Sequence, residues 1–269
     1  MKFSLKGLLT IAAAASALVL AGCGEKEADT SKIKVGVMAG AEAQVAEVAA
    51  KVAKEKYNLD VELVTFTDYV TPNAALDDGS IDVNAFQHKP YLDQQVADRG
   101  YKLTIAGNTF VYPIAGYSKQ VKAVDEIQEG ARIAVPNDPT NLGRSLILLE
   151  QQGLLKLREN VGLLATVRDI VENPKNITIV ELDAAQLPRS LDDVALSVIN
   201  TTYASSINLT PQKDGVFVED KESPYVNLIV SREDNAQAEN VQNFVKSYQT
   251  EEVYTAASDI FQGGVVKGW

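Results

Sequence analysis

The chain has 269 residues, of which 46% are hydrophobic and 23% charged, and this ordinary globular composition excludes disordered, collagen-like and multi-span membrane proteins. Residues 1–22 contain two lysines and no acid, so the rest carries 23 basic and 36 acidic side chains, a net charge of −13. Such an acidic body is ill suited to nucleic acid, whose phosphates require positive charge. One His and one Cys cannot supply zinc, haem or dithiol sites, so we expect no metal and no cofactor.

Residues 1–24 have the pattern of an export signal. Lys2 and Lys6 form a positive region before the apolar, alanine-rich stretch Leu8–Leu20. The following Leu20-Ala21-Gly22-Cys23 resembles a bacterial lipobox, in which the cysteine is acylated and becomes the mature N-terminus. We therefore predict a signal peptide over 1–22, a lipid anchor on Cys23 and a polar leash over 23–32. Because residues 7–24 form an uncharged run of 18 residues, an uncleaved anchor helix is the alternative.

Alternating hydrophobicity predicts strands at 33–38, 61–66 and 81–86, with a helix between the first two and a short helix around Pro72 before the third. The pattern restarts with a strand at 132–135, a helix with a leucine stripe over 142–154, and strands at 177–182 and 196–200. Two successive α/β patterns predict two lobes, each built on a mostly parallel sheet flanked by helices.

Two extended segments, 103–117 and 225–231, have no helical period, and a final helix over 241–248 follows the second. A late strand and helix suit a chain that returns to complete the first lobe. We predict lobe one from 31–112 plus 225–269 and lobe two from 113–224. The two crossings would form a hinge, with the carboxyl ends of the strands meeting at the cleft between the lobes.

The segment Val135–Arg144 combines a strand end, a turn rich in Pro, Asn and Asp, and a helix start. We expect Thr140 or Asn141 to cap that helix. Arg144 in the first turn opposes the helix dipole unless an anion lies beside it. Turn N–H groups and a guanidinium form a carboxylate-sized anion site. The alternative is that Arg144 pairs with a nearby acid such as Asp138.

Aromatic residues follow two of the predicted strands. Phe86, His88 and Tyr91 come after the third, and Tyr69 comes after the second, so all four belong at the cleft edge. Rings around an imidazole suit an aliphatic or thioether side chain, although each ring could instead be core. The chain contains no Gly-x-Ser-x-Gly or His-Glu-x-x-His motif, so we expect no enzyme.

Asn200 and Asn227 lie at the end of a predicted strand and within another. An amide in an apolar strand needs a partner, because burying it unpaired costs about 1 to 3 kcal/mol. The ammonium and carboxylate of a ligand would satisfy both amides, and a bridge to neighbouring backbone is the alternative.

Longer runs of sequence resemble the MetQ/NlpA family of methionine-binding lipoproteins. They cover nearly the whole mature chain and include residues 34–37, 66–73, 84–92, 107–118, 135–144, 172–176 and 223–228. The resemblance implies a type II two-lobed periplasmic-binding-protein fold that closes on methionine, L- or D-, and delivers it to an ABC importer made of a permease and a cytoplasmic ATPase. It implies a location on the periplasmic face of the cytoplasmic membrane, with the outer membrane as the alternative.

The ligand shell implied by this resemblance falls on Tyr69, Phe86, His88, Tyr91, Asn141, Arg144, Asn200 and Asn227. Arg144 would fork the α-carboxylate with help from Asn141 and Asn200, Asn227 would hold the amino-acid backbone, and the aromatic rings would pack the thioether. The alternatives are a receptor of the same fold for a methionine-containing dipeptide or another apolar amino acid, a secreted hydrolase, and a surface adhesin.

Overall fold

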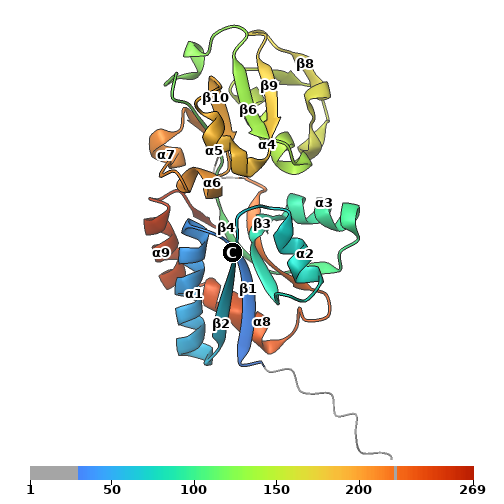
Figure 1. The fold of residues 1–269 in the computed structure, drawn as a ribbon, viewed down its shortest axis with the longest axis vertical. Helices are drawn as coiled ribbons and strands as arrows, with labels where there is room; N and C mark the ends of the chain where they lie inside the picture. Colours follow the sequence, from blue (N-terminus) through green and yellow to red (C-terminus); the bar gives the residue numbers. More distant parts are fainter. Residues whose placement is uncertain (1–29, 221–222) are drawn as a thin grey trace, which may run out of the picture.

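The computed structural model describes residues 30–220 and 223–269, so the expected signal peptide, Cys23 and most of the leash lie outside the described residues. The chain forms two lobes stacked along its long axis, each with its own sheet (Figure 1). Within the described ranges, no helix has the length and apolar character needed to span a membrane.

The first lobe contains a six-stranded sheet in the order β13-β4-β12-β3-β1-β2. Its parallel part is formed by β1 (Lys32–Met38), β2 (Asp60–Phe66) and β3 (Val83–His88). Helix α1 (Ala41–Tyr57) joins β1 to β2, and its predicted stripe packs into the core through Val45, Ala49 and Val52. The predicted βαβ unit is therefore present, because the 3.6-residue period places these side chains on one helix face.

The other half of this sheet is antiparallel. Strand β12 (Val226–Arg232) lies between β3 and β4 (Leu103–Val111), and β13 (Val266–Lys267) pairs with the outer edge of β4. The helices of this lobe besides α1 are α2 (Thr71–Asp77), α3 (Lys89–Arg99), α8 (Glu239–Tyr248) and α9 (Glu251–Ile260). The sequence predicted only one helix after β12. The second, α9, begins where the Thr250 side chain caps the Val253 N–H.

The second lobe contains a five-stranded sheet in the order β11-β5-β10-β6-β9. Its parallel part is β9 (Thr178–Leu182), β6 (Arg132–Pro136) and β10 (Leu196–Ile199), and β5 (Ala115–Tyr117) pairs antiparallel with β10 and β11 (Phe217–Val218). Its helices are α4 (Pro139–Gln151), α5 (Leu187–Ser190), α6 (Thr201–Ser205) and α7 (Pro211–Asp214), and a two-stranded sheet joins β7 (Lys156–Leu157) to β8 (Ile170–Glu172). Both sheets are thus mixed. The predicted parallel pairing is present among β1, β2 and β3 of the first sheet and among β9, β6 and β10 of the second.

Strand order shows how the chain passes between the lobes. The first passage connects β4 to β5, and the second connects β11 to β12. All strands of the first sheet come from 32–111 and 226–267, and all those of the second come from 115–218. These ranges are compatible with the lobe boundaries expected from the sequence, which stay a prediction.

The two lobes are in contact through a shared buried cluster, in addition to a core of their own. Met38, Phe86 and Tyr91 of the first lobe belong to the same cluster as Tyr117, Ile199 and Tyr203 of the second. The structure is therefore that of a closed pair of lobes, with the buried cluster beside the cleft.

Candidate functional site

A pocket of about 350 Å³, part of it open to solvent, lies between the lobes. All eight residues of the predicted ligand shell lie on its wall, which is formed by Tyr69, Phe86, Gln87, His88, Tyr91, Tyr112, Asn141, Arg144, Asn200, Thr201, Thr202 and Asn227. The sequence analysis missed Gln87, Tyr112, Thr201 and Thr202. Gln87, Thr201 and Thr202 lie within two residues of a predicted site residue, and Tyr112 lies in the predicted extended segment 103–117. Their position beside these residues was the signal that could have identified them.

The end of β3 forms the first-lobe wall. The third strand spans Val83–His88, two residues later than predicted, so Phe86 and His88 are strand residues and do not follow the strand. Asn227 of β12 is the register partner of His88, and its Nδ2 donates to the Phe86 carbonyl oxygen at 3.1 Å. The donor edge of Asn227 thus bridges neighbouring backbone, as the alternative proposed.

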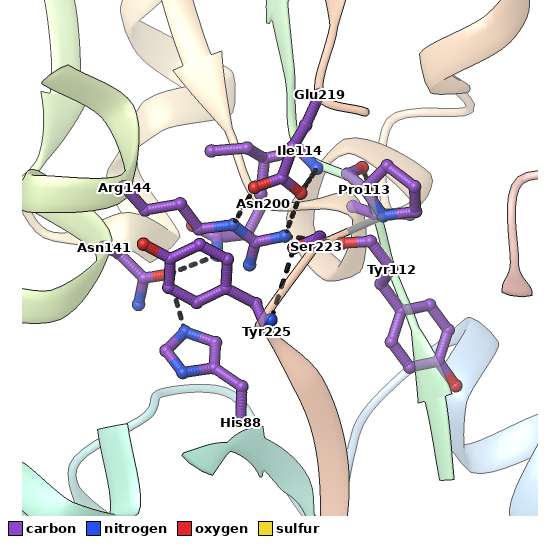
Figure 2. A network of polar contacts seen from close by, with 11 residues as sticks. His88, Tyr112, Pro113, Ile114, Asn141, Arg144, Asn200, Glu219, Ser223 and Tyr225 are labelled. Atoms are coloured by element: carbon purple, nitrogen blue, oxygen red, sulfur yellow. Dashed lines mark hydrogen bonds and ion pairs between the residues drawn. The ribbon is translucent and has the colours of Figure 1, made fainter. Parts of the chain in front are cut away.

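His88 connects the two walls. Its Nδ1 accepts a hydrogen bond from the Tyr91 backbone N–H at 3.2 Å, which caps α3, and its Nε2 lies 3.2 Å from Oδ1 of Asn141 in the second lobe (Figure 2). Because Nδ1 accepts, the ring proton is on Nε2, where it donates to Asn141. Burial, reinforced by the charge of Arg144, lowers the pKa of His88 to about 3. The imidazole is therefore neutral near neutral pH.

The apolar part of the wall is an aromatic cluster. The ring centroids of Tyr69, Phe86 and Tyr91 are 5.9 to 6.2 Å apart, and the Tyr91 hydroxyl donates to the Tyr69 carbonyl oxygen at 2.7 Å. Phe86 and Tyr91 are also members of the buried interlobe cluster. Core packing and cavity lining are therefore two roles of the same rings, and the two interpretations given by the sequence are compatible.

Helix α4 is capped by Asp138, and the expectation of Thr140 or Asn141 as the cap was wrong. The helix starts at Pro139, so the cap is the residue before it, and its carboxylate accepts from the Asn141 N–H at 2.9 Å. The same carboxylate accepts from Nδ2 of Asn141. Oδ1 of Asn141 is thereby turned toward His88 and Asn200. Nδ2 of Asn200 donates to this oxygen at 2.9 Å.

Arg144 forms an internal ion pair with Glu219, which comes directly after β11 (Figure 2). The Arg144 Nε atom donates to Oε1 of Glu219 at 2.8 Å, and Nη2 donates to Oε2 and to the Tyr112 carbonyl oxygen. The side chains of Arg144 and Glu219 are 3% and 10% exposed. Arg144 thus pairs with an acid, as the alternative stated, but that acid is 75 residues away and is not Asp138.

This ion pair corrects the implied role of Arg144. Its bidentate edge, Nε and Nη2, is occupied by Glu219, and the planar guanidinium then directs Nη1 away from Glu219. The Tyr225 ring lies against the guanidinium, 4.3 Å from its carbon to the ring centroid. Arg144 can offer a ligand carboxylate one terminal nitrogen, and not the fork expected from the resemblance.

Asn200 has an unused acceptor at the cavity. It follows β10 as the residue before α6, and its Oδ1 is buried with no hydrogen-bond partner among the described residues. A buried unpaired amide oxygen costs about 1 to 3 kcal/mol, which a donor on a ligand would recover. Because Oδ1 has no partner, Asn200 suits a ligand ammonium, while Nδ2 gives Asn141 only one of its two N–H donors, so the carboxylate role expected from the resemblance stays a prediction.

Comparison with known proteins agrees with this architecture. The family model described as NlpA lipoprotein matches residues 33–269. The chain belongs to the NlpA lipoprotein family. A curated member from Vibrio cholerae, called a probable D-methionine-binding lipoprotein MetQ, is 84% identical over the full length of both chains.

Solved structures of NlpA-like proteins have the same fold. A crystal structure of a methionine-binding protein, MetQ, is 72% identical with a TM-score of 0.89, and covers 90% of this chain and 99% of its own. A Coxiella burnetii ABC-transporter periplasmic substrate-binding protein is 47% identical with a TM-score of 0.86, over 88% of this chain and all of its own. A Burkholderia cenocepacia nutrient-binding protein bound to methionine is 50% identical with a TM-score of 0.86, over the same shares.

Proposed function

We propose that this NlpA lipoprotein is the methionine receptor of an ABC importer, with no catalysis of its own. The names of the V. cholerae relative and of the methionine-bound B. cenocepacia structure support methionine as the ligand. The C. burnetii substrate-binding protein supports an ABC permease and its cytoplasmic ATPase as partners. The observation that carries the proposal is an interlobe cavity that combines one guanidinium nitrogen, an unpartnered amide oxygen and an aromatic cluster.

In the proposed complex, each group of the amino acid meets a matching part of the wall. Nη1 of Arg144 donates to the α-carboxylate, and Oδ1 of Asn200 accepts from the ammonium. The thioether packs among Tyr69, Phe86 and Tyr91, because sulfur on an aromatic ring contributes about 0.3 to 1.5 kcal/mol. The pair of Arg144 with Glu219 is neutral as a unit, which suits a zwitterion with no net charge.

The anchor belongs to the same proposal. Acylation of Cys23 would attach the mature protein to the periplasmic face of the cytoplasmic membrane, where the permease lies, with residues 23–32 as the leash. Mass spectrometry of protein from the native host should find a mature chain that starts at a diacylated and N-acylated Cys23. An unprocessed Met1 or a free Cys23 thiol would contradict this part of the proposal.

A thermal-shift panel tests the ligand. Protein without residues 1–23, unfolded and refolded to remove carried ligand, is measured with L-methionine, D-methionine, leucine and a methionine-containing dipeptide. At 100 times Kd, binding stabilises the native state by about 2.7 kcal/mol. This corresponds to a shift of roughly 5 to 10 °C for a chain of this size. A shift with methionine and little with leucine is expected, whereas a shift with the dipeptide alone would favour a peptide receptor.

A further inference from the structure

Glu42 is an acid buried beside the cavity wall. It lies in the first turn of α1 and is 3% exposed, whereas Glu47 and Glu55 of the same helix are exposed. The α1 helix packs on the first-lobe core through Val45, Ala49 and Val52, so that core has no need of a buried carboxyl. A carboxyl in such a place requires a specific partner.

The partner of Glu42 comes from the other lobe. The hydroxyl of Thr202, in α6, is hydrogen-bonded to Oε1 of Glu42, and Thr202 lies on the cavity wall. The Thr202 hydroxyl thus joins the second lobe to a buried first-lobe group at the cleft.

The next residue strengthens this contact between the lobes. The ring of Tyr203 lies 4.9 Å from that of Tyr69, centroid to centroid, and its hydroxyl donates to the Thr67 carbonyl oxygen at 3.3 Å. Helix α6 therefore reaches the first lobe through two consecutive side chains, and both lie near the aromatic part of the cavity.

We propose that Glu42 is a positioning residue for ligand binding: as a neutral acid it holds Thr202 at the cavity wall when the lobes close, so that closure on the ligand takes up a proton. The inference rests on the proposed function, because it needs a ligand that stabilises the closed form. Glu42 acts through Thr202 and does not line the cavity itself.

Burial among neutral groups favours the neutral form of Glu42. Burial raises its pKa to about 8, and the hydrogen bond from Thr202 lowers it only in part. The titratable groups that interact with Glu42 from neighbouring elements are Tyr69, Tyr112, Tyr203 and Tyr248. Burial raises the pKa of each tyrosine above 10, so all four stay neutral.

Opening of the lobes should change the surroundings of Glu42. The ion pair between Lys51 of α1 and Glu252 of α9 stays about 14 Å away from Glu42 along the helix. When α6 moves away with the second lobe, water reaches the carboxyl, and the positive end of the α1 dipole then favours its ionised form. The open form should therefore have an ordinary carboxyl pKa, near 4.5.

The sign of the pH effect follows. Closure takes up a proton between the open-form value and about pH 8, so ligand affinity is greatest in acid and decreases as the pH rises through this window. The slope should approach about tenfold in Kd per pH unit, and the profile should become flat above the closed-form pKa. His88 lies at the same cleft and its pKa is lowered from 6.5 by burial, so closure releases a proton from its ring below about pH 6.5 and leaves the uptake by Glu42 unopposed between about pH 6.5 and 8.

The experiment is isothermal titration of L-methionine into protein without residues 1–23, between pH 5.5 and 9, in pairs of buffers with different ionisation enthalpies. Near pH 6.5 the wild type should take up close to one more proton per ligand than Glu42→Gln, which keeps the hydrogen bond and cannot ionise. The variant should also lack the loss of affinity that the wild type shows between about pH 6.5 and 8. Burial raises the pKa of Asp138 and lowers that of His88, but both residues are present in both proteins, so their titration cancels in the difference.

Glu47→Gln, on the exposed face of the same helix, is the matched control and should keep the wild-type profile. Thr202→Val removes the hydrogen bond that lowers the pKa of Glu42, so it should move the upper bend of the profile to higher pH. Equal proton uptake by wild type and Glu42→Gln, or a uniform loss of affinity at every pH, would overturn the inference alone. Failure of L-methionine to bind wild type at any pH would overturn the proposed function as well.

Discussion

Two acids lie where the lobes meet, Glu42 buried and Glu219 with a side chain 10% exposed, and they are balanced in different ways. Glu219 faces the guanidinium of Arg144, so its negative charge is compensated inside the protein. Glu42 is hydrogen-bonded to the Thr202 hydroxyl and is held neutral by burial. The comparison shows that a buried carboxyl can serve as a permanent charge that orients a cation or as a proton-dependent contact between lobes. Its partner decides which of the two it becomes.

Replacing Glu219, the acid that faces Arg144, should have the largest effect. Glu219→Gln leaves the charge of Arg144 buried without compensation, and breaking one side of a buried pair costs about 3 to 5 kcal/mol of unfolding free energy. Urea unfolding without ligand measures it. A loss below 1 kcal/mol would mean that the pair does not hold the guanidinium in place.

Arg144→Ala tests the other member of the pair through ligand binding. Loss of a charge-assisted hydrogen bond to the α-carboxylate should cost about 1.5 to 3 kcal/mol, or roughly 10- to 150-fold in Kd for L-methionine. Titration calorimetry well below the melting temperature separates this loss from the expected loss of stability. Unchanged affinity would place the carboxylate elsewhere.

Asn200→Ala removes the unpartnered acceptor opposite Arg144. We expect about 1 kcal/mol of lost binding, or roughly fivefold in Kd, because one neutral amide oxygen is replaced. If Oδ1 binds the ammonium, methionine should lose more affinity than an analogue whose amine is removed. An equal loss for both compounds would assign Asn200 a structural role through Asn141.

The smallest effect should come from Glu42→Gln at pH 5.5. The carboxyl is neutral there because its pKa is raised to about 8, so the amide replaces it in charge and shape. The free energy of unfolding should stay within about 1 kcal/mol of the wild type. Chemical unfolding beside Glu219→Gln makes the contrast direct, and similar losses for both variants would remove the distinction between the two acids.

Much of the architecture could be predicted because it depends on local patterns. Strands β1, β2, β6 and β9 lie within one residue of their predicted bounds, since period-two alternation marks a half-buried strand. Seven of the eight predicted site residues share one cavity because they lie near or after the ends of strands at the cleft edge, and Asn227 reaches it as the antiparallel partner of His88. Their gathering is thus a consequence of strand order, while their roles toward a ligand stay a proposal.

The errors occurred where packing overrides the local pattern. Ile81 extended the apparent alternation of the third strand, but it is buried in a separate cluster just before β3 begins. The α4 cap is Asp138 because Pro139 can occupy the first helical position without an N–H. These differences change which atoms of Asn141 and His88 face the cavity.

The sequence by itself indicated the two α/β patterns, most element positions and eight of the residues at the cleft, because periodicity and strand ends are local properties of the chain. Only the tertiary structure decided how those side chains are used. Glu219 meets Arg144 across 75 residues, and Glu42 meets Thr202 across 160, and no local pattern records either distance. Whether a buried acid carries a charge depends on what other segments bring to it, and folding alone establishes those neighbours.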